Sequence, residues 1–405
     1  MTADVAVAER DRLVRRNTTL LAIAQGCVQT TFPVLLVIGG PAASRLTGRD
    51  GAAGLLWAVY FLAAAAGAVL IGRWMDRIGR RPGLLLAYVL AGSATAAAAL
   101  SIRAGSFAGL LASTIPFGVA LGGANLGRGA VADMYAPERR GAAVGVVLAA
   151  GTVGAVLSPL IAAAIEGVAG DGSLLPWIVP VAGAVAAVVC ALAVRPDPRD
   201  LAVVDPAFAA IGGRTPRALF REPRFRAAVV AAAVGQMAMV GVMGVTPTAL
   251  DHMHHAGSTI SFVISIHIAG MFAFAPLIGW WMDRVGRRAA LVAGCVTSIA
   301  GALLAATEAG AVVIGVGLFA IGVGWSATFL GATAVISDIT AANERAGALG
   351  FTDLLVALTS AVAGLTGGIV LEAAGYGPLG ITLAVLVGIA LLVVARMREA
   401  APVRA

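Results

Sequence analysis

The sequence predicts an all-α membrane protein with twelve transmembrane helices arranged as two six-helix halves. Its composition, its long apolar runs and an internal repeat lead to this prediction. Of the 405 residues, 60% are hydrophobic and only 12% are charged, and the mean hydropathy is +0.94. In a water-soluble protein, roughly a quarter of the residues are charged. The composition therefore excludes soluble enzymes, nucleic-acid-binding proteins and secreted disulfide scaffolds. We expect most of the protein surface to contact the lipid bilayer.

Twelve apolar runs are each long enough to cross a hydrocarbon layer of roughly 30 Å at about 1.5 Å per residue. The first six runs lie near residues 18–40, 51–73, 83–103, 106–132, 142–165 and 174–194. The second six lie near residues 226–248, 258–281, 289–307, 310–336, 347–371 and 376–395.

The arginines set the expected orientation. All 28 basic residues are arginine. If the N-terminus is in the cytoplasm, only Arg45, Arg49 and Arg103 fall on the outer side. This asymmetry follows the positive-inside rule, so we expect both termini in the cytoplasm. Residues 1–17 contain four arginines, and we expect them to form a cytoplasmic segment rather than a cleaved signal peptide.

A ten-residue segment recurs about half the chain later. Residues 72–81 read GRWMDRIGRR, and residues 279–288 read GWWMDRVGRR. A looser echo pairs Asp133 with Asp338 in later connections. Repeats with the same orientation indicate two related halves. The expected parts are an N-terminal segment at 1–17, bundles at 18–194 and 226–395, a linker at 195–225 and a tail at 396–405.

The linker is rich in proline, arginine and aspartate. Its stretch beginning at Pro206 predicts a short amphipathic helix on the inner membrane face. We expect the linker to tether the two halves.

The repeated segments resemble the signature of the major facilitator superfamily, G-x-x-x-D-R-x-G-R-[KR], which both copies match in full. The resemblance implies a monomer with the major facilitator fold, whose two halves rock about a central site to give alternating access. It also implies a cytoplasmic gate, since carboxylates accept hydrogen bonds from helix N-termini and pair with arginines. The implied gating residues are Asp76, Arg77, Arg80, Asp283, Arg284 and Arg287.

Histidine and methionine are concentrated in one window. All four histidines lie between residues 252 and 267, and five of the ten methionines lie between 237 and 271. Met239 and Met243 share one helix face, as do His267 and Met271. Thioether and imidazole ligands favour copper over hard cations. The loop residues that are candidates for capturing the metal first are His252, Met253, His254 and His255.

Polar side chains of the first helix are candidates for lining the cavity. They are Gln25, Cys27 and Gln29, and Gln29 matches Gln236 at the spacing of the repeat. Cys27 is either a thiolate ligand from the first half or a small packing residue.

The pair Met-x-x-x-Met and His-x-x-x-Met resembles the motif pair of the CcoA-type copper importers. The resemblance implies that Met239, Met243, His267 and Met271 bind copper. It also implies that the protein imports copper for assembly of a haem-copper oxidase. Copper, bare or in a small complex, is then the transported substrate, and no resident cofactor is expected.

Two other classes of function stay open. The main alternative is a proton-coupled transporter of a small organic molecule, such as a drug or a riboflavin-like metabolite. Residues 112–116 lack the arginine that drug exporters carry in helix 4. Asp353, the only acid well inside a helix, is either the proton carrier or a partner of the segment from Asp76 to Arg81. A metal sensor or scaffold is disfavoured because it has no evident use for two gating segments.

The sequence predicts no enzymatic activity. It contains no nucleophile–base pair, phosphate loop or dinucleotide motif outside the apolar runs.

Overall fold

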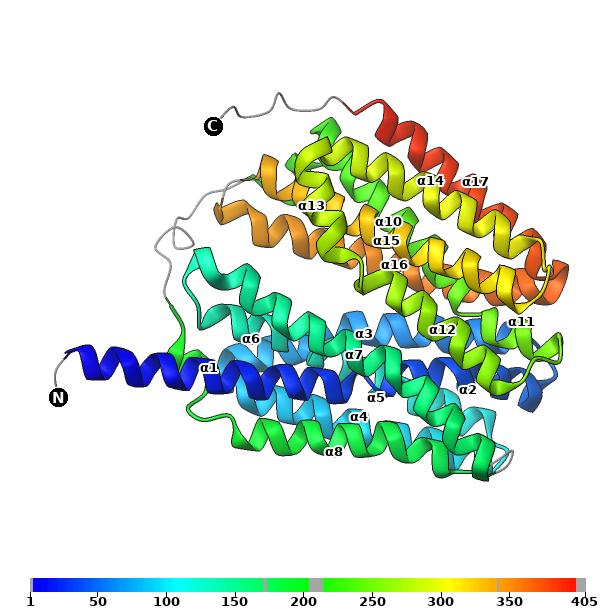
Figure 1. Cartoon of the computed structure of the whole chain (residues 1–405), viewed down its shortest axis with the longest axis horizontal. Coiled ribbons are helices and arrows are strands. Elements are labelled where there is room, and N and C mark those ends of the chain that lie inside the picture. The colour runs from blue at the N-terminus through cyan, green and yellow to red at the C-terminus, as the bar shows by residue number, and fades with distance from the viewer. Residues whose placement is uncertain (1–2, 170–172, 204–213, 341, 398–405) are drawn as a thin grey trace. The chain divides into compact units, whose positions relative to one another are not determined.

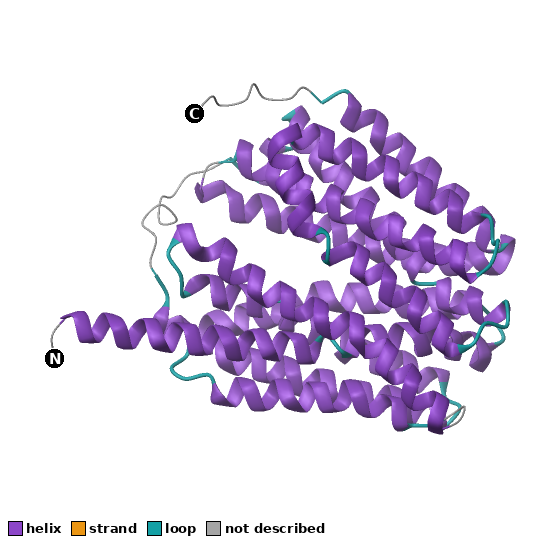
Figure 2. Ribbon diagram, in the orientation of Figure 1, coloured by secondary structure: helices purple, strands orange, loops and turns teal. Residues whose placement is uncertain are grey.

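The computed structural model describes residues 3–169, 173–203, 214–340 and 342–397. Within these ranges the chain consists of helices and loops, without strands (Figure 2). Twelve helical spans are long and apolar enough to cross a membrane. The prediction of an all-α, multi-pass membrane protein with twelve transmembrane helices is therefore confirmed.

The helices labelled in Figure 1 follow the order of the chain. Before the linker come α1 (Ala3–Val28), α2 (Thr31–Thr47), α3 (Gly51–Ile78), α4 (Arg80–Arg103), α5 (Phe107–Ala124), α6 (Gly127–Asp133), α7 (Pro137–Ala169), the 3₁₀ turn η1 (Leu175–Trp177) and α8 (Ile178–Ala193). The linker region contains η2 (Pro198–Leu201) and α9 (Pro216–Leu219). The remaining helices are α10 (Pro223–Met243), α11 (Thr246–His252), α12 (Gly257–Phe272), α13 (Ala275–Val285), α14 (Arg287–Ala306), α15 (Ala311–Ile339), α16 (Ala342–Ala374) and α17 (Tyr376–Ala395).

Four spans are broken where the apolar runs predicted continuous helices. The breaks separate α1 from α2, α5 from α6, α10 from α11 and α12 from α13. Pro247 and Pro276 lie in the first turns of α11 and α13, where a residue without a backbone N–H starts a new helix readily. At the first break the hydroxyl of Thr31 donates to the carbonyl of Val28 at 2.7 Å, replacing a backbone donor. Apolar periodicity does not reveal breaks of this kind.

The chain separates into two compact units. Unit 1 comprises Met1–Asp205 with Ala256–Ser265, and unit 2 comprises Pro206–His255 with Ile266–Ala405. Helix α12 is thus shared between the units. The division into halves at 18–194 and 226–395 stays a prediction.

Helices of unit 1 approach one another through small residues. A Cβ added at Gly122 of α5 would collide with the carbonyl oxygen of Ala64 in α3. One added at Gly154 of α7 would collide with the carbonyl oxygen of Gly26 in α1. Such contacts bring helix backbones together where lipid provides no hydrophobic driving force.

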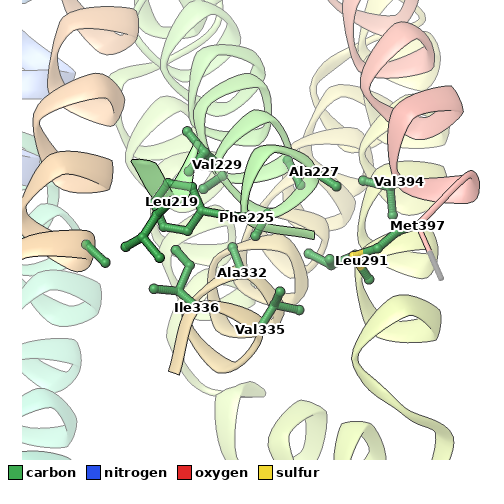
Figure 3. Close-up of a cluster of buried hydrophobic side chains, with 14 residues drawn as sticks. Leu219, Phe225, Ala227, Val229, Leu291, Ala332, Val335, Ile336, Val394 and Met397 are labelled. Carbon is green, nitrogen blue, oxygen red and sulfur yellow. The ribbon is translucent and has the colours of Figure 1, made fainter. Parts of the chain in front are cut away.

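One end of unit 2 is filled by the apolar cluster shown in Figure 3. Leu219, Phe225 and Ile336 are almost fully buried in it. Its members come from the end of α9, the beginnings of α10, α14 and α16, and the ends of α15 and α17, with Met397 just after α17. This end also carries residues 279–288. We call it the motif end of unit 2, and the motif end of unit 1 is the one that carries residues 72–81.

Residues 195–203, the first described part of the linker, pack on the motif end of unit 1. The backbone N–H of Val203 donates to the carbonyl of Asp133 at 2.8 Å. Arg10 donates from Nη2 to the carbonyl of Leu201 at 2.9 Å. The amphipathic helix predicted from Pro206 lies outside the described residues.

Candidate functional site

Arg80 joins two carboxylates at the motif end of unit 1. Its Nη1 donates to Asp76 Oδ1 at 2.8 Å, and its Nε donates to Asp133 Oδ2 at 3.0 Å. The chain turns from α3 into α4 at Gly79, whose φ of +110° is rarely adopted by residues with a side chain. Arg80 therefore ties this turn to the end of α6.

Arg287 makes the corresponding contacts in unit 2. Its Nη1 donates to Asp283 Oδ1 at 2.7 Å, and its Nε donates to Asp338 Oδ2 at 3.4 Å. Arg284, expected among the gating residues, lies instead over the ring of Trp280, with 3.7 Å between its Cζ and the ring centroid.

Four of the six implied gating residues are thus brought together in two pairs. They are Asp76 with Arg80 and Asp283 with Arg287. Arg77 is exposed.

The linker residue Asp197 contacts the first gating turn. Its Oδ1 accepts the backbone N–H of Arg80 at 3.1 Å, and its Oδ2 accepts that of Arg81 at 2.9 Å. The first N–H groups of a helix have no partner within the helix, so Asp197 caps α4 from outside. Arg199 adds a bond from Nη1 to the carbonyl of Asp76 at 3.2 Å.

His267 is fully buried in unit 2, and one of its two ring nitrogens has a hydrogen-bond partner. Its Nδ1 lies 2.6 Å from the carbonyl oxygen of Leu318 in α15. A carbonyl only accepts, so Nδ1 carries the proton and Nε2 carries a lone pair. Nε2 has no hydrogen-bond partner among the described residues. A histidine fixed in this way by its other nitrogen has the arrangement usual for metal-binding imidazoles.

Two phenylalanine rings and one glutamine contact the indole of Trp325 in the same unit. The indole N–H of Trp325 donates to Gln236 Oε1 in α10 at 2.6 Å. The ring stacks on Phe329, with 5.2 Å between centroids and an interplanar angle of 13°. Phe272 of α12 meets it edge-on at 5.6 Å. We call Gln236, Phe272, Trp325 and Phe329 the tryptophan cluster.

Helix α15 shows the relative depths of the sulfur and imidazole groups. The bond between Gln236 and Trp325 fixes one common depth for α10 and α15. Helix α15 runs toward the motif end and Leu318 precedes Trp325 by seven residues, whereas α10 runs away from it and Met243 follows Gln236 by seven. Leu318 and Met243 therefore both lie about 10.5 Å farther from the motif end than this bond. Met243 and His267 therefore lie at similar depth. Met239 and Met271 each lie one helical turn nearer the motif end. All four side chains are buried.

The loop residues proposed to capture a metal lie at the end of α11. His252 and His254 are exposed, and His254 has a φ of +59°. The backbone N–H of His255 turns back to the carbonyl of Leu250 at 3.0 Å. Over the described part of the chain, no group of three or more His, Cys, Asp or Glu side chains is arranged to hold a metal ion.

One of the cavity candidates, Gln25 of α1, lies at the break between α5 and α6. Gln25 donates from Nε2 to Asn125 Oδ1 at 3.4 Å. The Oε1 atoms of Gln25 and Gln29 are buried and have no partner within the described ranges. Cys27 is partly buried and forms no disulfide.

The comparison with protein families agrees with the resemblance carried by the two repeated segments. The model of the Major Facilitator Superfamily matches residues 18–256 and 229–405. The chain belongs to the Major Facilitator Superfamily. This membership makes it a transporter rather than an enzyme.

Three superfamily proteins illustrate the similarity. The uncharacterized MFS-type transporter YdeG of Bacillus subtilis is 26% identical over 380 residues, covering 90% of this chain and 87% of YdeG. The riboflavin transporter RfnT of Brucella anthropi is 26% identical over 366 residues, covering 89% of this chain and 90% of RfnT. The partially occluded inward-open structure of the xylose transporter XylE from E. coli has a TM-score of 0.72 at 16% identity, covering 96% of this chain and 98% of XylE. The closer resemblance to copper importers stays a prediction.

Two contacts and one buried hydroxyl of this superfamily member were missed in the sequence. Asp197 stands before Pro198, a cap followed by proline at the first helical position, which is a recognisable helix start. Trp325 and Phe329 are four residues apart in an apolar run and so share a face. Tyr88 places a hydroxyl inside another apolar run. Asp353, the candidate proton carrier, is exposed on α16.

Proposed function

We propose that this superfamily member moves a small organic molecule with a flat aromatic heterocycle, of the kind riboflavin contains, across the membrane by alternating access. The observation that carries the proposal is the tryptophan cluster of unit 2. The full-length similarity to a protein named as a riboflavin transporter supports it.

The tryptophan cluster suits a flat ring. Aromatic side chains bind planar rings by offset stacking and by edge-to-face contact. The bond to Gln236 fixes the indole of Trp325, and Phe329 supports one of its faces. A fixed aromatic surface binds a ring with little loss of side-chain entropy.

Uptake of radiolabelled riboflavin tests this proposal in cells that lack their own riboflavin carrier. We expect wild-type protein to accumulate riboflavin above empty cells. Trp325→Ala should abolish most of the uptake, and Trp325→Phe should retain part because a ring remains. Phe262→Ala, at an exposed position of α12, is the matched control and should transport normally. Accumulation equal to that of empty cells overturns the proposal.

The proposed setting is a bacterial inner membrane, with both termini in the cytoplasm and the chain acting as a monomer. The distribution of arginines supports this orientation. The moving parts are the bundles at 18–194 and 226–395. Asp353 is the proposed proton carrier, and its exposure on α16 is compatible with access to water.

Copper import, supplying haem-copper oxidase assembly, is a second candidate favoured by one specific observation. His267 presents a buried Nε2 lone pair while Nδ1 is held by Leu318. Buried methionines at similar depth supply soft sulfur ligands, which select Cu(I). An imidazole must be neutral to bind a metal, and its hydrogen bond to a carbonyl keeps the required tautomer.

Copper accumulation measured by mass spectrometry separates the two candidates. Cells expressing wild type, His267→Ala, the pair Met239→Leu/Met243→Leu and the loop variant His255→Ala are compared at equal membrane expression. Uptake abolished in the first two variants supports a copper path at these residues. Equal copper in all strains and in empty cells overturns it.

A further inference from the structure

Two buried oxygens without partners lie next to Gly127 in unit 1. Tyr88 is fully buried and Gln25 is 5% exposed. Neither Tyr88 Oη nor Gln25 Oε1 has a hydrogen-bond partner within the described ranges. A Cβ built on Gly127 would lie 3.6 Å from Gln25 Oε1 and 3.7 Å from Tyr88 Oη. Both oxygens therefore border the same small space.

Several helices create this space together. Helix α5 ends at Ala124 and α6 begins at Gly127, so a glycine stands at the break. Tyr88 reaches the break from α4, and Gln25 reaches it from α1. The amide nitrogen Nε2 of Gln25 donates to Asn125 Oδ1. The amide oxygen Oε1 of Gln25 therefore remains available as an acceptor. Because Gly127 has no side chain, nothing of its own fills the space.

Polar atoms of this kind are rarely left alone. An unsatisfied buried donor or acceptor costs about 1–3 kcal/mol, so such atoms almost always face a water or a ligand. A phenol both donates and accepts, whereas an amide oxygen only accepts. A hydroxyl group matches both, because it donates to Gln25 Oε1 and accepts from Tyr88.

We propose that Tyr88, Gln25 and the open side of Gly127 form a subsite for a hydroxyl group of the transported molecule. The inference rests on the proposed function, because it requires an organic substrate. It adds one chemical feature of the substrate, namely a hydroxyl group. In the absence of substrate a water fills the same place, and a substrate hydroxyl reproduces that water's hydrogen bonds.

Two variants remove the subsite by different routes. Gly127→Ala places a methyl group beside both oxygens at ordinary contact distance, so it fills the space without a clash. Tyr88→Phe removes the hydroxyl and keeps the ring. Gly129→Ala is the matched control on the same helix, because a Cβ there meets nothing within 4 Å.

The subsite is tested by comparing the uptake of two flavins by wild type and the variants at equal membrane expression. Riboflavin carries a hydroxylated ribityl chain, and lumiflavin carries a methyl group in its place. We expect wild type and Gly129→Ala to prefer riboflavin. In Gly127→Ala and Tyr88→Phe, riboflavin uptake should fall by about tenfold, the effect of losing one or two hydrogen bonds, while lumiflavin uptake stays within about twofold.

The other outcomes overturn the inference in distinguishable ways. Riboflavin uptake unchanged in both variants means that the space holds only a structural water. An equal loss for both flavins means that the variants disturb folding or gating rather than hydroxyl recognition. A wild type without preference also contradicts the subsite. A wild type that takes up neither flavin overturns the proposed function, and this inference with it.

Discussion

The backbone N–H of Arg80 donates to the carboxylate of Asp197 at 3.1 Å. Asp197 belongs to the linker, and Arg80 is the residue whose guanidinium joins Asp76 to Asp133. The linker therefore holds the base of the first gating turn. A segment expected to act as a tether thus also contacts Arg80, one of the residues proposed to form the cytoplasmic gate.

Asp197→Ala tests this positioning role. Loss of a helix cap costs about 1 kcal/mol, so we expect a lower Tm in detergent and slower transport. Asp200→Ala, an exposed acid in the same 3₁₀ turn, should behave as wild type. Asp197→Asn keeps one acceptor oxygen, so its Tm should lie between that of Asp197→Ala and that of wild type. A Tm for Asp197→Ala equal to that of wild type would show that the cap contributes no stability.

Gly79→Ala should be more harmful than an ordinary glycine substitution. The φ of +110° strains any L side chain, and the new Cβ would lie 2.6 Å from Asp197 Oδ2. We expect a loss of roughly 1–3 kcal/mol, measured by thermal or chemical unfolding. Gly145→Ala, inside α7 with nothing within 4 Å of the added Cβ, should be neutral or slightly stabilising. Equal stability of the two variants would contradict the strain at Gly79.

The fold followed from signals that act over long stretches of sequence. Twelve spans were predictable because long apolar runs mark them, and the repeated segments around Asp76 and Asp283 predicted two similar turns with paired aspartate and arginine. The helix breaks were not, since the turn at Asn125 and the prolines at 247 and 276 barely change the mean hydropathy of their runs.

The candidate site was predictable only in its residue types. The sequence pointed to His267 as a buried polar group, but its bond to Leu318 joins residues 51 positions apart in sequence. The bond between Gln236 and Trp325 spans 89 positions. Contacts over such distances are set by helix packing, which a single sequence does not specify.

Arg80→Gln and Arg287→Gln should slow transport with little effect on stability. The aspartates that they pair with at the motif ends are exposed, and solvent-exposed ion pairs contribute about 0–1 kcal/mol. Flavin uptake should therefore fall in each variant while Tm stays close to that of wild type. Arg103→Gln, away from both turns, is the control. A large drop in Tm with proportional loss of uptake would indicate a structural role instead.

Arg214 is joined to Glu344 in unit 2. Its backbone N–H and its Nε donate to Oε1 at 2.7 and 3.0 Å, and its Nη2 donates to Oε2 at 2.9 Å. The hydrogen bond to Glu344 raises the pKa of Arg214. A raised pKa in the folded state gives stability that is present below the unfolded pKa and is lost only as pH rises through the folded value. For arginine this loss lies above the working range.

We therefore expect Arg214→Ala to lower Tm by the same amount at about pH 6 and at about pH 9. The reason is that Arg214 stays charged, and paired with Glu344, throughout this interval. Arg217→Ala, an exposed arginine in α9, is the matched control and should leave Tm unchanged. Thermal unfolding in detergent at the two pH values measures the difference. A Tm loss that disappears between these pH values would mean that the pair titrates, and would contradict the raised pKa.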